Sequence, residues 1–235
     1  DGYVLDAAET ILPEPSAGDF RFRILGPDGA AVRDFEVDHE RELHLIVVGT
    51  DLATYAHLHP ERGDDGTWSI LLGPLPPGTY RAFADFAVAG GPELTLGVDI
   101  AVPGDAAYSP LPAPSGVATV DGYDVAVTGA PVAGEEAELA LTVTRDGRPV
   151  DDLEPYLGAF GHLVAIRGGD LGYLHVHPLG DVPGPAARGG PEVRFAVEVP
   201  SPGDYRLFFD FSHGGTVRTA SFTVSVAPAG QAGGS

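Results

Sequence analysis

The chain has 235 residues, 43% of them hydrophobic, and a formal net charge of −21. This length fits two domains of ordinary size, each able to bury a core. The negative charge argues against nucleic acid and anionic membrane surfaces as partners. Because the chain has no cysteine, disulfides and thiolate metal sites are excluded.

The chain also lacks methionine, and its first residue is Asp1. We therefore expect a processed protein that is secreted, periplasmic or at the cell surface and whose signal peptide has been removed. No stretch is long and apolar enough to span a bilayer, so we expect no membrane insertion of the mature chain. A diffuse acidic surface of this kind favours solubility.

Residues 1–103 contain short apolar runs separated by turn residues, a pattern typical of β-strands joined by tight loops. The clearest runs lie at 20–24, 43–48, 54–59, 67–72, 80–86 and 93–102. Segments rich in Gly, Pro and Asp, such as 26–29 and 63–66, separate them. The pattern predicts a first β domain over residues 1–103.

Residues 104–118 are rich in Pro, Ala, Ser and Gly and are predicted to form a linker. The plan then repeats over residues 119–227, which we predict to be a second β domain. Its apolar runs lie at 138–144, 162–166, 173–177, 193–199 and 216–226. Residues 228–235 are predicted to be a flexible tail.

No segment shows sustained helical periodicity, and each copy holds about seven short runs, which is typical of a β-sandwich. A Pro-Gly-x-Tyr-Arg motif recurs around Tyr80 and Tyr205. It resembles the tyrosine corner of immunoglobulin-like sandwiches, in which the hydroxyl bonds to the chain upstream. We predict an all-β chain of two tandem immunoglobulin-like or cupredoxin-like β-sandwich domains joined by the Pro-rich linker.

Six of the eight histidines form two equivalent triplets, with a constant offset of 118 residues between the copies. The triplets are His44, His57 and His59 in the first copy and His162, His175 and His177 in the second. Asp51-Leu52 and Asp170-Leu171 lie between the first and second histidines of each triplet and predict the turn of a hairpin.

If the first hairpin turns near residues 51–52, His44 lies opposite His59, and His57 lies opposite Ile46. Alternation along the strands then puts all three imidazoles on one face. Three imidazoles so placed can converge on one ion at the Zn–N distance of about 2.0–2.1 Å. The same register in the second copy puts His162 opposite His177, with His175 on the diagonal.

Asp85 and Asp210 recur in the Asp-Phe pairs of the two copies and are candidates for a fourth ligand or for a carboxylate that orients an imidazole N–H. Tyr80 is expected to point inward, which turns Asp85 outward, whereas His44, with Ile46 and Val48, is expected to point inward. Asp85 then reaches the site only through a strand bulge or at the end of the sandwich.

Two further histidines belong to one copy each. His39 precedes His44 and has no counterpart in the second copy, and His213 follows Asp210 and has no counterpart in the first. Each is a candidate for an additional ligand at one site, but we expect both to be surface residues.

The repeated motifs resemble those of a family of secreted or membrane-tethered bacterial proteins that is common in high-GC Gram-positive bacteria. Members carry the His-Leu-x-Val-Val, Asp-Leu, His-x-His-Pro and Pro-Gly-x-Tyr-Arg-x-Phe-x-Asp-Phe series in tandem domains and are loosely called heavy-metal-binding. The resemblance covers residues 2–226. It implies the sandwich fold and export.

Histidine ligands without Cys or Met suit Cu(II) and Zn(II), and the Irving–Williams order favours Cu(II). We expect a secreted or periplasmic protein that holds Cu(II) first, and zinc second, at one site in each domain, for sequestration or trafficking. A three-histidine metal with an open position could activate water or oxygen, so catalysis stays open. We expect binding more than catalysis, because no nucleophile motif or substrate pocket is evident. The alternative is an immunoglobulin-like adhesion or interaction module with structural histidines; its protein partner is unknown.

Overall fold

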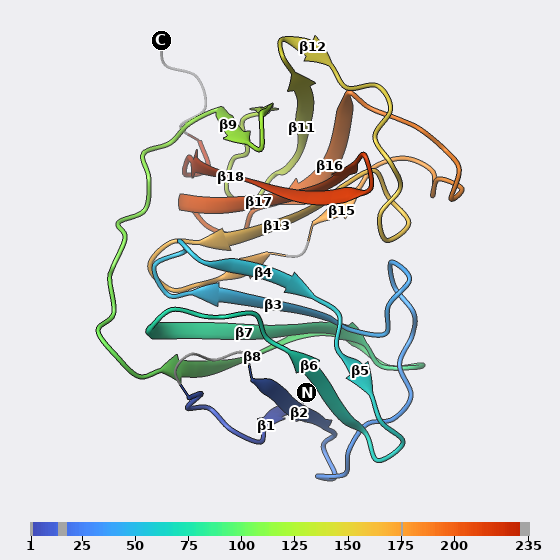
Figure 1. Ribbon diagram of the computed structural model, residues 1–235, viewed down its shortest axis with the longest axis vertical. Coiled ribbons are helices and arrows are strands. Elements are labelled where there is room, and N and C mark those ends of the chain that lie inside the picture. The colour runs from blue at the N-terminus through green and yellow to red at the C-terminus, as the bar shows by residue number, and fades with distance from the viewer. Residues whose placement is uncertain (1, 14–17, 175, 231–235) are drawn as a thin grey trace. The chain divides into compact units, whose positions relative to one another are not determined.

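The computed structural model of the chain describes residues 2–13, 18–174 and 176–230 (Figure 1). The chain divides into two compact units, Asp1–Pro110 (unit 1) and Leu111–Ser235 (unit 2). His175 and residues 231–235 of the predicted tail lie outside the described residues. Within the described ranges, no helix is long and apolar enough to cross a membrane.

Unit 1 consists of two antiparallel sheets with the strand orders β1-β2-β6-β5 and β4-β3-β7-β8. The strands of the first sheet are β1 (Val4–Ala7), β2 (Asp19–Leu25), β6 (Thr67–Leu71) and β5 (Glu61–Arg62). Those of the second are β4 (Tyr55–Leu58), β3 (His44–Gly49), β7 (Gly78–Ala87) and β8 (Glu93–Val102).

Unit 2 repeats this plan with the orders β15-β16-β11-β10-β9 and β14-β13-β17-β18, and β12 pairs with β11. The strands of the first sheet are β9 (Val117–Val120), β10 (Tyr123–Thr128), β11 (Glu136–Arg145), β12 (Arg148–Pro149), β15 (His177–Pro178) and β16 (Glu192–Glu198). Those of the second are β13 (His162–Arg167), β14 (Tyr173–Leu174), β17 (Gly203–His213) and β18 (Thr216–Val226).

Each unit buries one core between its two sheets. In unit 1, Phe22 and Trp68 from one sheet join Leu45 and Phe86 from the other. Burial of large apolar side chains is the main force that holds such sheets face to face. The predicted all-β chain of two tandem immunoglobulin-like β-sandwich units is confirmed.

The tyrosine corner is confirmed in both units. The Tyr80 hydroxyl donates to the carbonyl oxygen of Pro76 at 2.6 Å, and the Tyr205 hydroxyl donates to that of Ser201 at 2.9 Å. Both rings are buried, so each bond satisfies a hydroxyl that burial would otherwise leave without water. The corner thus fixes the entry into β7 and into β17.

The recurrent Asp-Leu pair forms the predicted hairpin turn in each unit. Asp51 Oδ1 accepts from the backbone N–H of Ala53, and Asp170 Oδ1 accepts from that of Gly172. The leucine that follows each aspartate has a positive φ, 59° in the first turn and 57° in the second. These aspartates therefore shape the turns by bonding to the backbone two residues on.

The prediction that His44, Ile46 and Val48 face the sandwich core is wrong. The core of unit 1 takes the odd-numbered residues of β3, including Leu45 and Val47, so the even-numbered residues point to the opposite face of the sheet. Because the strand is an unbroken apolar run, hydrophobicity did not identify its core face.

Candidate functional site

The histidines of the first triplet converge as the sequence predicted. Strand β3 begins at His44, and β4 pairs with it so that Leu58 lies opposite Leu45 and His57 opposite Ile46. His59 follows β4 directly. One ring nitrogen from each histidine lies within 4.8 Å of those from the other two. In a tetrahedral zinc site the nitrogens lie roughly 3.3 Å apart, so small side-chain movements would close this set around an ion.

The imidazole of His44 is held by two hydrogen bonds. Its Nε2 lies 3.2 Å from the carbonyl oxygen of Asp38, and its Nδ1 lies 3.1 Å from Nε2 of His57. A carbonyl only accepts, so Nε2 carries the proton and the lone pair of the neutral ring is on Nδ1. This arrangement directs a metal-binding lone pair toward His57, as a carbonyl partner does for histidine ligands in metal sites.

Burial and, to a lesser degree, the neighbouring His57 together lower the pKa of His44 from its ordinary value of 6.5 to about 4. The Asp38 carbonyl and the Asp85 carboxylate act in the opposite direction. His44 is therefore neutral at pH 7, which is the form that binds metal.

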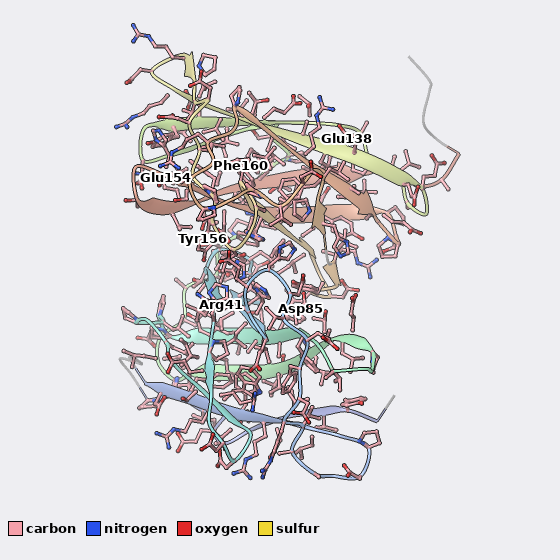
Figure 2. The ribbon with its side chains drawn as sticks, turned by 90° about the vertical axis from the view of Figure 1, so that its right-hand side faces the viewer. Arg41, Asp85, Glu138, Glu154, Tyr156 and Phe160 are labelled. Atoms are coloured by element: carbon pink, nitrogen blue, oxygen red, sulfur yellow. The ribbon has the colours of Figure 1, made fainter. Side chains whose placement is uncertain are left out.

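Asp85 lies directly opposite His44 in the ladder between β3 and β7. Opposed residues share a face, so Asp85 lies on the histidine face without the strand bulge that we expected from the sequence. Its Oδ1 accepts from the Thr95 hydroxyl at 3.1 Å, and Figure 2 marks its place in unit 1. Its role as a ligand or as an orienting carboxylate stays a prediction.

The turn that holds the Asp38 carbonyl was not predicted. Asp38 and Arg41 form a bridge, and His39 and Glu40 between them have positive φ angles of 46° and 64°. The ring of His39 lies 6.3 Å from that of His44, centroid to centroid. The turn thus brings a backbone oxygen and a further imidazole to the triplet.

Unit 2 repeats this turn 118 residues later. Tyr156 and Ala159 form the bridge, Leu157 and Gly158 have positive φ angles, and the Tyr156 carbonyl accepts from Nε2 of His162 at 2.8 Å. The side chains of the two turns differ at every position, so the backbone acceptor that the turns share could not be recognised from the sequence.

The predicted opposition of His162 and His177 is wrong. His162 is buried and lies opposite Asp210, whose Oδ1 accepts from the Thr219 hydroxyl. His177 is exposed and belongs to β15, which pairs with β16 in the other sheet of the unit. His175 lies outside the described residues. Over the part of the chain that the structure describes, only the first triplet forms a group of metal-binding side chains.

His213, expected at the surface, is half-buried and bonded on both sides. Its Nδ1 lies 2.7 Å from the Tyr123 hydroxyl and its Nε2 lies 2.9 Å from Asp152 Oδ1. Arg145 and Arg218 flank the Tyr123 ring. With both ring nitrogens engaged, His213 acts as a structural link at the end of β17.

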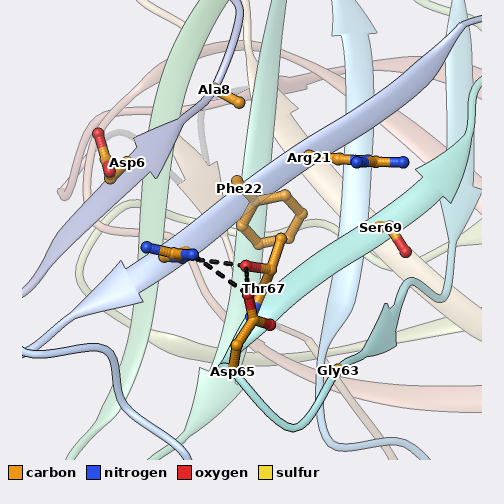
Figure 3. A pocket seen from close by; sticks show the side chains of 9 residues that line it. Asp6, Ala8, Arg21, Phe22, Gly63, Asp65, Thr67 and Ser69 are labelled. Atoms are coloured by element: carbon orange, nitrogen blue, oxygen red, sulfur yellow. Dashed lines mark hydrogen bonds and ion pairs between the residues drawn. The ribbon is translucent and has the colours of Figure 1, made fainter.

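A shallow groove of about 560 Å³ lies over β1, β2 and β6 of unit 1 (Figure 3). Arg23, one of the residues that line it, donates to the Thr67 hydroxyl at 3.0 Å and to Asp65 at 3.2 Å. Arg23, Thr67 and Asp65 thus bond to one another, and the triplet does not line the groove.

No curated protein matches the chain. Among solved structures, the two-domain fibronectin type-III segment of chicken tenascin is 10% identical, with 96% of this chain and 100% of that one covered at a TM-score of 0.29. The D00-D0 domain of intimin is 10% identical over 96% and 99%, at 0.28. A putative membrane anchored protein from Corynebacterium diphtheriae is 11% identical over 97% and 59%, at 0.28. TM-scores of this size carry no argument about function.

The repeat that the motifs predicted coincides with a repeated family match. The profile of one family fits residues 1–104 and again residues 118–228, once in each unit. Together these segments make up most of the chain. The chain therefore belongs to the family described as Domain of unknown function (DUF8832).

Proposed function

We propose that unit 1 binds one divalent transition-metal ion, Cu(II) ahead of Zn(II), through His44, His57 and His59. The observation that carries this proposal is the convergence of three ring nitrogens within 4.8 Å. The low pKa of His44 and its tautomer add to it, because they leave Nδ1 without a proton at neutral pH. Three neutral imidazoles form a set typical of Cu(II) and Zn(II) sites.

Copper is the first choice because an unspecialised nitrogen site follows the Irving–Williams order. The chain has neither Cys nor Met, the soft ligands that select Cu(I). Cu(II) is the form expected in an oxidising compartment, so the proposal includes a location outside the cytoplasm. The role is sequestration or transfer of the ion, and His39 and Asp85 are the nearest candidates to complete its coordination.

A second candidate function is an interaction module in which the histidines are structural. It is favoured by the hydrogen bonds that His44 already makes to Asp38 and His57, and by the equivalent bond from His162 to Tyr156. Histidines bonded in this way stabilise a protein without any ion. The two functions differ in one measurable respect, which is metal uptake.

The test is calorimetric titration of the chelator-treated protein with Cu(II) and, separately, with Zn(II). Trp68 is the only tryptophan and belongs to unit 1, so its fluorescence reports binding in that unit. We expect one equivalent of Cu(II) per chain, bound more tightly than Zn(II) and accompanied by a change in Trp68 emission. No uptake would favour the interaction module. A second equivalent that is lost on His162→Ala would restore the two-site prediction.

A further inference from the structure

The two units differ in where the chain crosses from one sheet to the other. In unit 1 the crossing lies between Leu58, the end of β4, and Glu61, the start of β5. In unit 2 the strand that follows the crossing, β15, starts at His177. With the 118-residue offset applied, β15 begins two residues earlier than β5 does. This shift removes His177 from the sheet that carries His162.

Pairing alone does not explain the later crossing of unit 1. The β5–β6 register places Glu61 opposite Ser69, and continuing it would place His59 opposite Leu71, which is still within β6. A longer ladder was therefore possible, as it is in unit 2, where His177 pairs with Ala196. A proline follows the third histidine of the triplet in both copies, so the proline does not account for the difference.

An ion pair in unit 1 joins β5 to the segment just before β3, beside this crossing. Arg62 of β5 donates to both carboxylate oxygens of Glu42, from Nε at 3.1 Å and from Nη2 at 3.0 Å. Its guanidinium also lies 5.6 Å from the ring centre of Phe35 and 5.7 Å from that of Trp68. A two-bond pair of this kind fixes orientation as well as distance, and the aromatic faces add cation–π attraction.

The pair spans the triplet along the chain. Glu42 precedes His44 by two residues, and Arg62 follows His59 by three. Both side chains are partly shielded from water, at 35% and 21% exposure, so the attraction is screened less than at an open surface. Holding these two points together holds the intervening crossing, and with it His59, at the start of β3.

Unit 2 has neither member of the pair. The equivalent positions carry Phe160 and Gly180. The ring of Phe160, labelled in Figure 2, packs so closely on Gly189 that a Cβ there would lie 2.6 Å from it. Gly180 has a φ of 114°, a conformation that side-chain-bearing residues rarely adopt. An apolar contact thus replaces the ion pair.

We propose that Glu42 and Arg62 are positioning residues that set the crossing point of unit 1 and hold His59 beside His44 and His57. In its effect on metal affinity this inference rests on the proposed function; in its effect on His59 it stands alone. The pair thereby keeps the three histidines of unit 1 together.

The experiment compares Glu42→Gln and Arg62→Lys, which keep side-chain size but remove the charge or the two-bond geometry. Asp99→Asn is the matched control, because it breaks the exposed Arg81–Asp99 pair elsewhere in unit 1. Two quantities are measured on the full chain. One is the rate at which diethyl pyrocarbonate modifies His59 in the metal-free protein, followed by peptide mass spectrometry. The other is the Cu(II) dissociation constant.

We expect both test variants to raise the modification rate of His59 at least about threefold and to weaken Cu(II) binding about tenfold, a loss of about 1.4 kcal/mol. The control should change neither. An unchanged His59 rate in both variants would overturn the inference whatever the metal result. If the wild-type protein takes up no Cu(II), the proposed function fails while the His59 rate still decides the role of the pair. Unchanged affinity in a protein that does bind Cu(II) would also overturn it.

Discussion

The two units share a fold and a motif spacing, yet they place their histidines differently. Both keep the tyrosine corner, the Asp-Leu turn and the backbone acceptor for the first histidine. They differ after the edge strand of the second sheet, β4 in unit 1 and β14 in unit 2. His59 lies beside His44, whereas His177 pairs with a strand of the other sheet. Packing constrains the centre of a sheet from both faces, whereas an edge strand can exchange partners at little cost. Identical spacing therefore does not guarantee identical geometry at an edge.

The largest expected effect comes from removing one histidine in each unit. His59→Ala should weaken Cu(II) binding at unit 1 by on the order of a hundredfold or more, since it deletes one of three ligands. His177→Ala, the same change at the equivalent position, should leave that affinity unaltered. Titration calorimetry measures both. Equal losses of affinity in the two variants would show that both units bind metal alike and would refute the difference inferred between them.

The same variants separate a ligand from a structural histidine. A ligand that is partly solvated in the metal-free state should cost little apo stability when it is deleted. A core histidine would leave a cavity and unpaired groups, a loss of on the order of 2 kcal/mol or more. Collapse of apo His59→Ala with Cu(II) uptake unaltered would end the metal hypothesis for unit 1.

Acid should destabilise unit 1 through His44. Its pKa falls from 6.5 to about 4 on folding, so between these values the unfolded chain binds a proton that the folded chain does not. Stability therefore rises with pH across this window and is lost as pH falls from 6.5 toward 4. A shift of this size corresponds to about 3 kcal/mol at most.

Urea unfolding followed by Trp68 fluorescence at a series of pH values isolates this effect in unit 1. His44→Gln should flatten the dependence between pH 6.5 and 4. Cu(II) affinity should fall over the range in which the ligand histidines take up protons, because protons compete for the lone pairs. If the stability of unit 1 were the same at pH 4.5 and pH 6.5, the buried neutral state of His44 would be refuted.

The sequence was sufficient to predict those features of the fold that depend on local chemistry or on the internal repeat. The turn at Asp51-Leu52 set the register of the hairpin, so the placement of His57 opposite Ile46 followed correctly. The Pro-Gly-x-Tyr-Arg motif correctly predicted the hydrogen bonds of both tyrosine hydroxyls. Two tandem sandwiches followed from the repeat and from the absence of helical periodicity.

Features that depend on long-range contacts could not be predicted from the sequence. The core face of β3 was misassigned because apolar residues occupy both of its faces. The bonds from His44 to the Asp38 carbonyl and from His162 to the Tyr156 carbonyl use backbone atoms, which every residue has. The early crossing of unit 2 depends on which strand the chain joins next, and the His-x-His-Pro motif carries no information about that choice.

A smaller effect tests what the two units have in common. Tyr80→Phe and Tyr205→Phe each remove a hydroxyl that bonds to a backbone carbonyl, and each should destabilise its own unit by roughly 1–3 kcal/mol. Thermal unfolding measures the loss, and Cu(II) affinity should be unchanged in both variants. Loss of stability in one unit alone would mean that the corner serves only that sandwich. Unchanged melting in both would contradict its structural role altogether.

The smallest effect concerns the carboxylate beside the triplet. Asp85 lies opposite His44 and accepts a hydrogen bond from Thr95. Its carboxylate is not one of the three converging ligands, but its negative charge favours a cation at the site. Asp85→Asn keeps the shape and the hydrogen bond but removes the charge, so Cu(II) affinity should fall about fivefold, or about 1 kcal/mol, and less at high salt. Asp99→Asn, on the adjacent strand, serves as the control for net charge alone. A loss on the scale of His59→Ala would instead make Asp85 a ligand, and the coordination set would then be three imidazoles and one carboxylate. Because β3 and β7 pair without a bulge at this point, such a set would need only side-chain rotation.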